Sequence, residues 1–129
     1  MICSLIIKYA TKYSLKAVLL ASIVHQESSL NPKAINDTAR PYSYGLGQLI
    51  ESTALGTCGL KKKDIMDPDK NLDCTAKYLS YQINRYPGNV GKAISAYNAG
   101  TFTKRNRQYV DDVINKSYDN ICRIHLADL

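Results

Sequence analysis

A nearly continuous apolar stretch from Ala17 to Val24, interrupted only by Ser22, most constrains the fold of this 129-residue chain. The stretch is too continuous for one face of a surface helix, so it predicts a helix buried on most sides. At about ten residues it is also too short to cross a bilayer. Glu27 follows at its end. A carboxylate there is costly to ionise, so its pKa should rise towards the range that a general acid needs.

Helical periodicity and chain breakers predict a single domain over residues 1–129, with an all-α fold or minimal β structure. No segment shows a convincing strand alternation, and residues 121–129 suggest no element. Two stretches, 31–44 and 56–67, have the composition of loops. The predicted helices are 2–12, 14–27 with Ser14 as N-cap, 46–55, 68–84, 90–98 and 107–116.

The chain carries a net charge of +6, which favours polyanionic surroundings such as nucleic acid, an anionic membrane surface or bacterial cell wall. No recognised nucleic-acid motif is present, so we expect no nucleic-acid partner. The segment from His25 to Ser29 is not a zinc-protease motif, because the second histidine of that motif is replaced by Ser29. We therefore expect no metal and no organic cofactor.

The four cysteines leave several disulfide patterns open. Cys3 and Cys122 lie near the two chain ends, which are often close in space. Cys58 and Cys74 flank a predicted loop. These positions favour the pairs Cys3–Cys122 and Cys58–Cys74, with four reduced thiols as the alternative.

Three short segments stand out by their order and spacing: Glu27-Ser28, Gly45-Leu46-Gly47-Gln48 and Ala96-Tyr97-Asn98-Ala99-Gly100. Each alone is typical of an ordinary helix end or turn. Together they resemble the catalytic domain of the soluble lytic transglycosylases, relatives of goose-type lysozyme, over roughly residues 4–118. Further segments contribute to this resemblance: Tyr44–Ala54, Asp67-Pro68, Asn71-Leu72, Tyr78-Leu79 and Tyr109–Val113. The chain departs from the family pattern at Thr75, where glycine is usual, and at Glu51, where proline is common.

The resemblance implies a lysozyme-like α domain with a substrate cleft that cleaves the MurNAc–GlcNAc β-1,4 bond of peptidoglycan. Glu27 would protonate the glycosidic oxygen and then act as base, while the sugar's own 6-hydroxyl attacks the anomeric carbon. The product would be a 1,6-anhydroMurNAc end. Ordinary glycoside hydrolysis needs two carboxylates, and Asp37 is the best candidate for a second one, although a turn role suits it better.

The resemblance also assigns roles to the first two segments. Ser28 would anchor the loop near Gly45. Gly45 and Gly47 would allow the backbone to approach the glycan closely. Gln48 would hydrogen-bond the substrate.

Two aromatic residues and an asparagine complete the expected site. Tyr97 would hydrogen-bond Glu27 and tune its acidity. Asn98 would contact an N-acetyl group or brace Tyr97. Tyr44 would line the cleft, with core packing as an equally good interpretation.

Two rival functions stay open from the sequence. One is a lysozyme-type muramidase with water as acceptor, and the other is an inactive glycan-binding component of an envelope-spanning machine. The retained set of Glu27, Gln48 and Tyr97 argues against an inactive protein.

The expected binding partner is peptidoglycan. The protein could act with the components of a secretion, conjugation or pilus system, and phage entry is another setting. We expect a monomer without a transmembrane segment. The first residues do not resemble a signal peptide, so the expected location, the periplasm or cell envelope, comes with no evident export route.

Overall fold

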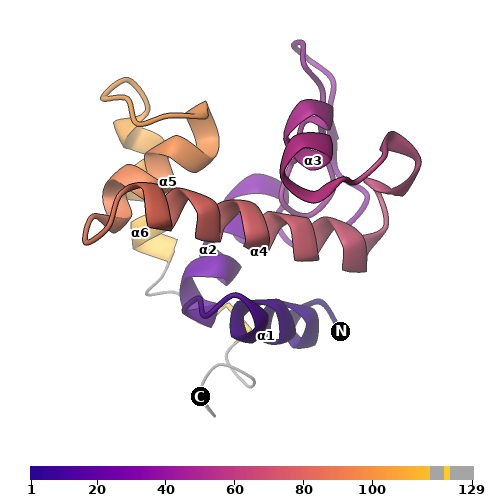
Figure 1. Cartoon of the computed structure of the whole chain (residues 1–129), viewed down its shortest axis with the longest axis horizontal. Helices are drawn as coiled ribbons and strands as arrows, with labels where there is room; N and C mark the ends of the chain where they lie inside the picture. The colour runs from indigo at the N-terminus through magenta and orange to yellow at the C-terminus, as the bar shows by residue number, and fades with distance from the viewer. Residues whose placement is uncertain (117–120, 123–129) are drawn as a thin grey trace.

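Six α-helices dominate the part of the chain that the structure describes, residues 1–116 and 121–122 of the computed structural model (Figure 1). A 3₁₀ turn, η1 (Lys62–Asp64), and two short strands, β1 (Ile35–Asn36) and β2 (Ser43–Tyr44), complete the elements. The expectation of an all-α fold with minimal β structure is therefore confirmed. The helices are α1 (Ile2–Lys12), α2 (Ala17–Ser28), α3 (Glu51–Cys58), α4 (Pro68–Arg85), α5 (Val90–Ala99) and α6 (Arg107–Lys116).

The long helix α4 crosses the middle of the molecule, with α1 below it and α2 behind it in Figure 1. Its start is well specified, because Pro68 occupies the first turn and the Asp67 side chain accepts a hydrogen bond from the Lys70 backbone N–H. Helix α4 packs against α1, α3 and α5, so it connects both sides of the molecule.

Helix α2 is buried as its apolar sequence predicts. It packs against α1 and α6, and residues on all of its sides are inaccessible to solvent. Leu20, Ile23 and Val24 are each 0% exposed. The predicted N-cap was wrong: Ser14 lies in a left-handed turn after α1, and the extended Lys16 precedes α2 instead.

The third helix begins later than the sequence predicts. Residues 44–48, which we call the glycine turn, form a tight reversal in which Tyr44 and Leu49 exchange backbone hydrogen bonds. Gly45 and Gln48 have φ values of 74° and 50°. Left-handed residues at these positions cannot continue a helix, so α3 starts at Glu51.

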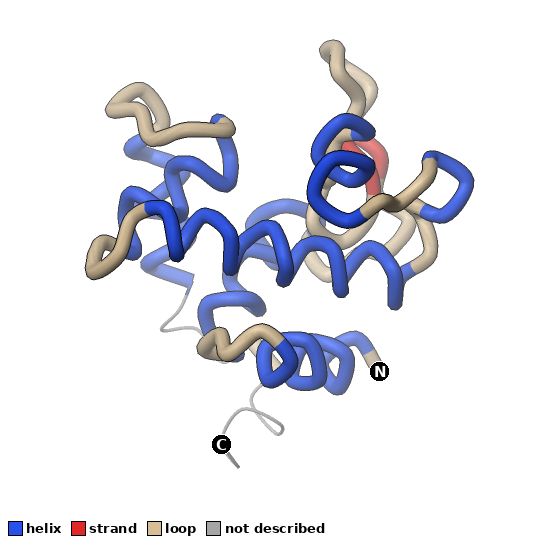
Figure 2. The backbone as a smooth tube through the Cα atoms, viewed as in Figure 1, coloured by secondary structure: helices blue, strands red, loops and turns tan. Residues whose placement is uncertain are grey.

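The predicted loop 31–44 contains the antiparallel pair β1–β2, in which Ile35 pairs with Tyr44 and Asn36 with Ser43. Figure 2 shows this pair beside α3, next to the loop that joins the two strands. Ser43 thereby lies next to the glycine turn. No described helix combines the length and apolar character needed to span a membrane.

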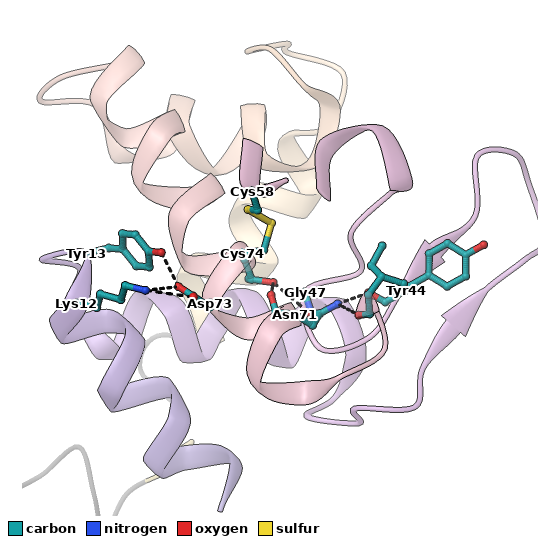
Figure 3. The surroundings of a disulfide bond; sticks show 10 residues. Lys12, Tyr13, Tyr44, Gly47, Cys58, Asn71, Asp73 and Cys74 are labelled. Atoms are coloured by element: carbon teal, nitrogen blue, oxygen red, sulfur yellow. Dashed lines mark hydrogen bonds and ion pairs between the residues drawn. A yellow bond between two sulfur atoms is a disulfide. The ribbon is translucent and has the colours of Figure 1, made fainter. Parts of the chain in front are cut away.

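Two disulfides cross-link the chain, and they are the pairs that the sequence favours. Cys3 in α1 bonds to Cys122, and Cys58 at the end of α3 bonds to Cys74 in α4 (Figure 3). The second bond belongs to a small hydrophobic cluster separate from the main core, with Leu49, Ala54 and Ile65 as its other buried members. Because this cluster is small, the disulfide is expected to contribute much of the attachment of α3 to α4.

Replacing both Cys58 and Cys74 by serine should lower the free energy of unfolding by about 3 kcal/mol, because the bond closes a short loop with a sequence separation of 16. Urea denaturation under non-reducing conditions measures the difference. A loss below about 1 kcal/mol would show that the bond constrains the unfolded chain far less than its loop length predicts.

Candidate active site

Glu27 lies in the last turn of α2 and is half-buried. Burial is the main influence on its carboxyl group and raises the pKa from 4.5 to about 7. A smaller, opposing effect comes from Tyr109, whose hydroxyl donates a hydrogen bond to Glu27 Oε2 at 2.5 Å. The carboxyl is therefore protonated in a substantial fraction of molecules near neutral pH, as a general acid requires.

The tyrosine that contacts Glu27 is not the one expected from the sequence. Tyr97 instead donates its hydroxyl proton to the carbonyl of Gly47 at 2.7 Å and is only 6% exposed. Helix α6 packs against α2 and brings Tyr109 to the carboxylate, whereas α5 brings Tyr97 to the glycine turn. Tyr109 lies one helical turn before Val113, which is buried, so both face the core side of α6. The spacing could place Tyr109 on this face but could not identify Glu27 as its partner.

A cavity of about 210 Å³ opens beside Glu27. In Figure 1, α3 lies towards one end of α4 and α5 towards the other, and residues from both regions contribute to the lining. Three expected residues, Gln48, Tyr97 and Asn98, line this cavity together with Glu27. Most of the other contributors lie in segments that carry the resemblance but had no individual role assigned: Leu49, Ile50, Thr53, Tyr78, Ala99 and Gly100. Ser43 lies outside those segments.

Ser28 joins α2 to the glycine turn, as the resemblance implied. It is buried, and its hydroxyl lies 2.8 Å from the carbonyl oxygen of Leu46 and 3.1 Å from that of Val24. Ser28 does not line the cavity and acts behind it. Tyr44 also lies away from the cavity, against the small hydrophobic cluster beside α3.

The two glycines of the turn pack against α4, whereas the sequence predicted that they would lie against the glycan. Gly45 and Gly47 are buried against α4 and do not face the cavity. A Cβ on Gly47 would lie 1.9 Å from Thr75 Oγ1, and one on Gly45 would lie 2.5 Å from Asn71 Nδ2. The glycines are therefore needed for close approach of the turn to α4, which corrects their expected role in admitting glycan.

The two carboxamides at the cavity are held by the protein. Gln48 Nε2 donates to the carbonyl oxygens of Ala34 at 3.1 Å and Gly45 at 3.0 Å. Asn98 Oδ1 accepts a hydrogen bond from Asn106 at 3.0 Å, so the expected contact with Tyr97 is replaced by one to the loop before α6. Both groups are thus fixed before any ligand binds, which lowers the entropic cost of binding.

Among the described residues, Glu27 is the one acid that lines the cavity. Asp37, the best candidate for a second carboxylate, is exposed in the loop between β1 and β2 and lies outside the lining. The site therefore offers one carboxyl that can give and take a proton, without the carboxylate pair of ordinary glycosidases.

Replacing Tyr109 by phenylalanine should lower kcat by about tenfold, because the carboxylate formed after proton transfer loses its hydrogen-bond donor. The same hydrogen bond lowers the pKa of Glu27, so losing the bond should raise this pKa from its value of about 7. The alkaline limb of the kcat/KM profile should then move to higher pH. Tyr81→Phe, at an exposed position on α4, is the matched control, and an unmoved limb in Tyr109→Phe would contradict this role.

Known proteins similar to this chain include peptidoglycan-cleaving enzymes by name. The chain matches the family model of the transglycosylase SLT domain over residues 4–119. It is 32% identical over 111 residues to the membrane-bound lytic murein transglycosylases C of Yersinia pestis (strain Pestoides F) and Yersinia pseudotuberculosis (serotype O:1b, strain IP 31758). The matched region covers 74% of this chain and 30% of each relative, so the chain spans about a third of their length.

Two solved structures share the fold. An inactive mutant of lytic transglycosylase Slt from Pseudomonas aeruginosa superposes with a TM-score of 0.81 at 23% identity, covering 95% of this chain and 24% of that one. The 70-kDa soluble lytic transglycosylase of Escherichia coli gives a TM-score of 0.68 at 24% identity, covering 88% and 19%.

Proposed function

Because this chain belongs to the transglycosylase SLT domain family, we propose that it is a peptidoglycan lytic transglycosylase that cleaves the MurNAc–GlcNAc β-1,4 bond. The observation that carries the proposal is Glu27, whose pKa is raised to about 7 at a cavity with no second lining acid among the described residues. One carboxyl that acts first as acid and then as base suits a reaction in which the substrate supplies its own nucleophile.

In the proposed reaction, protonated Glu27 donates its proton to the glycosidic oxygen as the bond from that oxygen to the anomeric carbon breaks. Positive charge develops on the MurNAc ring, as in other glycoside cleavages. The 6-hydroxyl of the same ring then attacks the anomeric carbon, and the Glu27 carboxylate takes up its proton. The products are a 1,6-anhydroMurNAc end and a GlcNAc with a free 4-hydroxyl, and Glu27 is protonated again.

Tyr109 supports the second half of this cycle. Its hydroxyl donates to Glu27 Oε2, so the negative charge that appears after the first proton transfer already has a partner. The raised pKa keeps this carboxylate basic enough to accept the proton of the 6-hydroxyl.

Substrate binding is assigned to the cavity lining. The carboxamides of Gln48 and Asn98 can recognise hydroxyl and N-acetyl groups, and Tyr78 offers an aromatic ring at the wall. Tyr97 is nearly inaccessible, so we assign it a supporting role through Gly47. Ser28, Tyr44 and Gly45 likewise support the site from outside the cavity.

Mass spectrometry of purified peptidoglycan digested by this protein tests the proposal. Intramolecular attack forms products one water lighter than those of hydrolysis, so anhydro ends are expected. Reducing MurNAc ends would instead identify a muramidase with water as acceptor. Binding without any cleavage would support an inactive glycan-binding component.

We propose that the protein acts in the cell envelope, where peptidoglycan is found. The curated relatives named above are membrane-bound murein transglycosylases by name, which supports this location. Local opening of the wall for a secretion, conjugation or pilus system, or for phage entry, stays a proposal about its biological setting.

A further inference from the structure

Asn71 of α4 lies behind the glycine turn, and each polar position of its side chain has a partner (Figure 3). Its Nδ2 donates to the carbonyl oxygens of Tyr44 at 2.9 Å and Ile65 at 2.8 Å. Its Oδ1 accepts from the backbone N–H of Gly47 at 3.0 Å. It also lies 3.2 Å from Thr75 Oγ1, whose single proton it shares with the closer backbone carbonyl of Asn71 at 2.9 Å. The residue is 0% exposed. A carboxamide has two N–H donors and an oxygen with two acceptor positions, so this one is fully satisfied inside the protein.

The turn that Asn71 contacts has a backbone that needs support. Gln48 adopts a φ of 50°, in the left-handed region that residues with a side chain seldom occupy. Such conformations persist only when the surrounding structure enforces them. Asn71 binds the turn at Tyr44 and again at Gly47, on either side of Gly45, and so holds both of its halves against α4.

The opposite side of the turn carries two residues of the cavity. Gln48 lines the cavity directly, and the carbonyl of Gly47 accepts the hydroxyl of Tyr97, another lining residue. Asn71 itself is not part of the lining. A shift of the turn relative to α4 would therefore displace Gln48 together with the acceptor of the Tyr97 hydroxyl. Helix α2 contacts the turn through Ser28, but the Glu27 carboxyl itself is bound by Tyr109 of α6.

Thr75 secures the carboxamide from one helical turn further along α4. Its hydroxyl lies 2.9 Å from the backbone carbonyl of Asn71 and 3.2 Å from Asn71 Oδ1. It is 0% exposed and packs directly against Gly47.

We propose that Asn71, held by Thr75, is a positioning residue for glycan binding. It fixes the glycine turn and thereby places Gln48, and the Gly47 carbonyl that holds Tyr97, at the cavity without itself touching the substrate. This inference rests on the proposed function. It predicts a specific kinetic signature, because Glu27 and its hydrogen-bond partner lie on other helices. Loss of the support should weaken binding and leave the proton-transfer step intact, which raises KM with little change in kcat.

Two variants test the proposal on soluble peptidoglycan fragments. Thr75→Val keeps the shape of the side chain and removes only its hydroxyl, so it is expected to fold and to raise KM by about fivefold. Asn71→Ala removes all four contacts and should raise KM by more than about tenfold. In both variants, kcat should stay within about twofold and the alkaline limb of the pH profile should stay in place, because Glu27 keeps its hydrogen bond to Tyr109.

Tyr13→Phe is the matched control, because Tyr13 follows α1 and its hydroxyl binds the same helix α4 at a different place. It also removes one hydroxyl hydrogen bond to α4, at 2.5 Å to Asp73, but this bond joins α1 and does not involve the turn (Figure 3). Its KM is expected to equal that of the wild type even if its melting temperature falls. A rise in KM for Tyr13→Phe as large as that for Thr75→Val would reduce the role of Asn71 to general stability and overturn the proposal. So would an unchanged KM in Thr75→Val.

Hydrogen exchange of the Gly47 amide separates this inference from the proposed function. That N–H is bonded to Asn71 Oδ1, so its exchange should accelerate in Thr75→Val and stay unchanged in Tyr13→Phe, whether or not the protein cleaves glycan. If the wild type cleaves no peptidoglycan, the proposed function fails, and the exchange result alone decides whether Asn71 fixes the turn. Unchanged exchange in Thr75→Val would refute it.

Discussion

Glu27→Gln is expected to keep the fold and to reduce peptidoglycan cleavage by about a thousandfold or more, because a positioned general acid contributes on the order of 10²–10⁴ and here the same group also acts as base. Glutamine has nearly the shape of the protonated carboxyl but cannot deliver or accept the proton. Turnover measured by release of soluble muropeptides, together with circular dichroism of the variant, checks both parts. Substantial remaining activity in the folded variant would refute the role of Glu27.

The chain offers a matched control, because Glu51 is its only other glutamate. Glu51 is exposed in α3 and pairs with Lys62 at 3.4 Å, outside the cavity lining. Glu51→Gln should therefore retain turnover within about twofold, since exposed ion pairs contribute little. Loss of activity in both variants would indicate that net charge matters more than the position of the acid.

The same Glu27→Gln substitution has an expected effect on stability whose sign follows from the raised pKa. The folded state binds the proton more tightly than the unfolded chain, so the stability that Glu27 contributes is complete below its ordinary pKa of 4.5. This contribution is lost as the pH rises through about 7. Glu27→Gln should therefore be more stable than the wild type at pH 8, by up to about 3 kcal/mol, with a smaller difference at pH 4.5. Urea denaturation at the two pH values measures this, and a difference of the opposite sign would contradict the burial of the charge.

Local signals were sufficient for most of the helices. The stretches 2–12, 68–84, 90–98 and 107–116 agree with α1, α4, α5 and α6 to within one residue at each end. Periodic apolar residues, Pro68 at a helix start and Gly100 at a helix end are all readable without tertiary contacts. Burial of α2 could also be predicted from the local sequence, because its nearly continuous apolar residues leave no polar face.

The features that escaped prediction depend on contacts between distant segments. Helix α3 starts late because the glycine turn is held by Asn71, 24 residues beyond Gly47. The choice between Tyr97 and Tyr109 as partner of Glu27 depends on how α5 and α6 pack, which periodicity does not reveal. Glu27 could be predicted as a candidate acid, because a carboxylate that ends an apolar helix is visible in the local sequence, but only the two other segments distinguished it from an ordinary helix end.

The close contact between Gly47 and Thr75 predicts a second large effect on catalysis: a substitution at Gly47 should lower kcat/KM, and a second substitution at Thr75 should partly restore it. Gly47→Ala should lower kcat/KM by about a hundredfold, because displacement of a site by about 1 Å can cost that much. The new Cβ would lie 1.9 Å from Thr75 Oγ1 and 2.6 Å from its methyl carbon, so the turn must move away from α4. The backbone of Gly47 is not in the left-handed region, so the defect would come from this collision alone.

Adding Thr75→Gly removes each of the three atoms that the new Cβ of Gly47→Ala would meet, since all of them belong to the Thr75 side chain. The double variant Gly47→Ala/Thr75→Gly should therefore recover at least about tenfold in kcat/KM over Gly47→Ala, although glycine within α4 costs about 1 kcal/mol of stability. Thr75→Gly alone should be impaired only modestly, by the loss of its hydroxyl contact with Asn71. Independent effects would instead leave the double variant worse than either single one, and that result would show that the turn and α4 do not constrain each other at this contact. Recovery would mean that the size of residue 75 sets how closely the turn, with Gln48 and the acceptor of the Tyr97 hydroxyl, approaches the helix behind it.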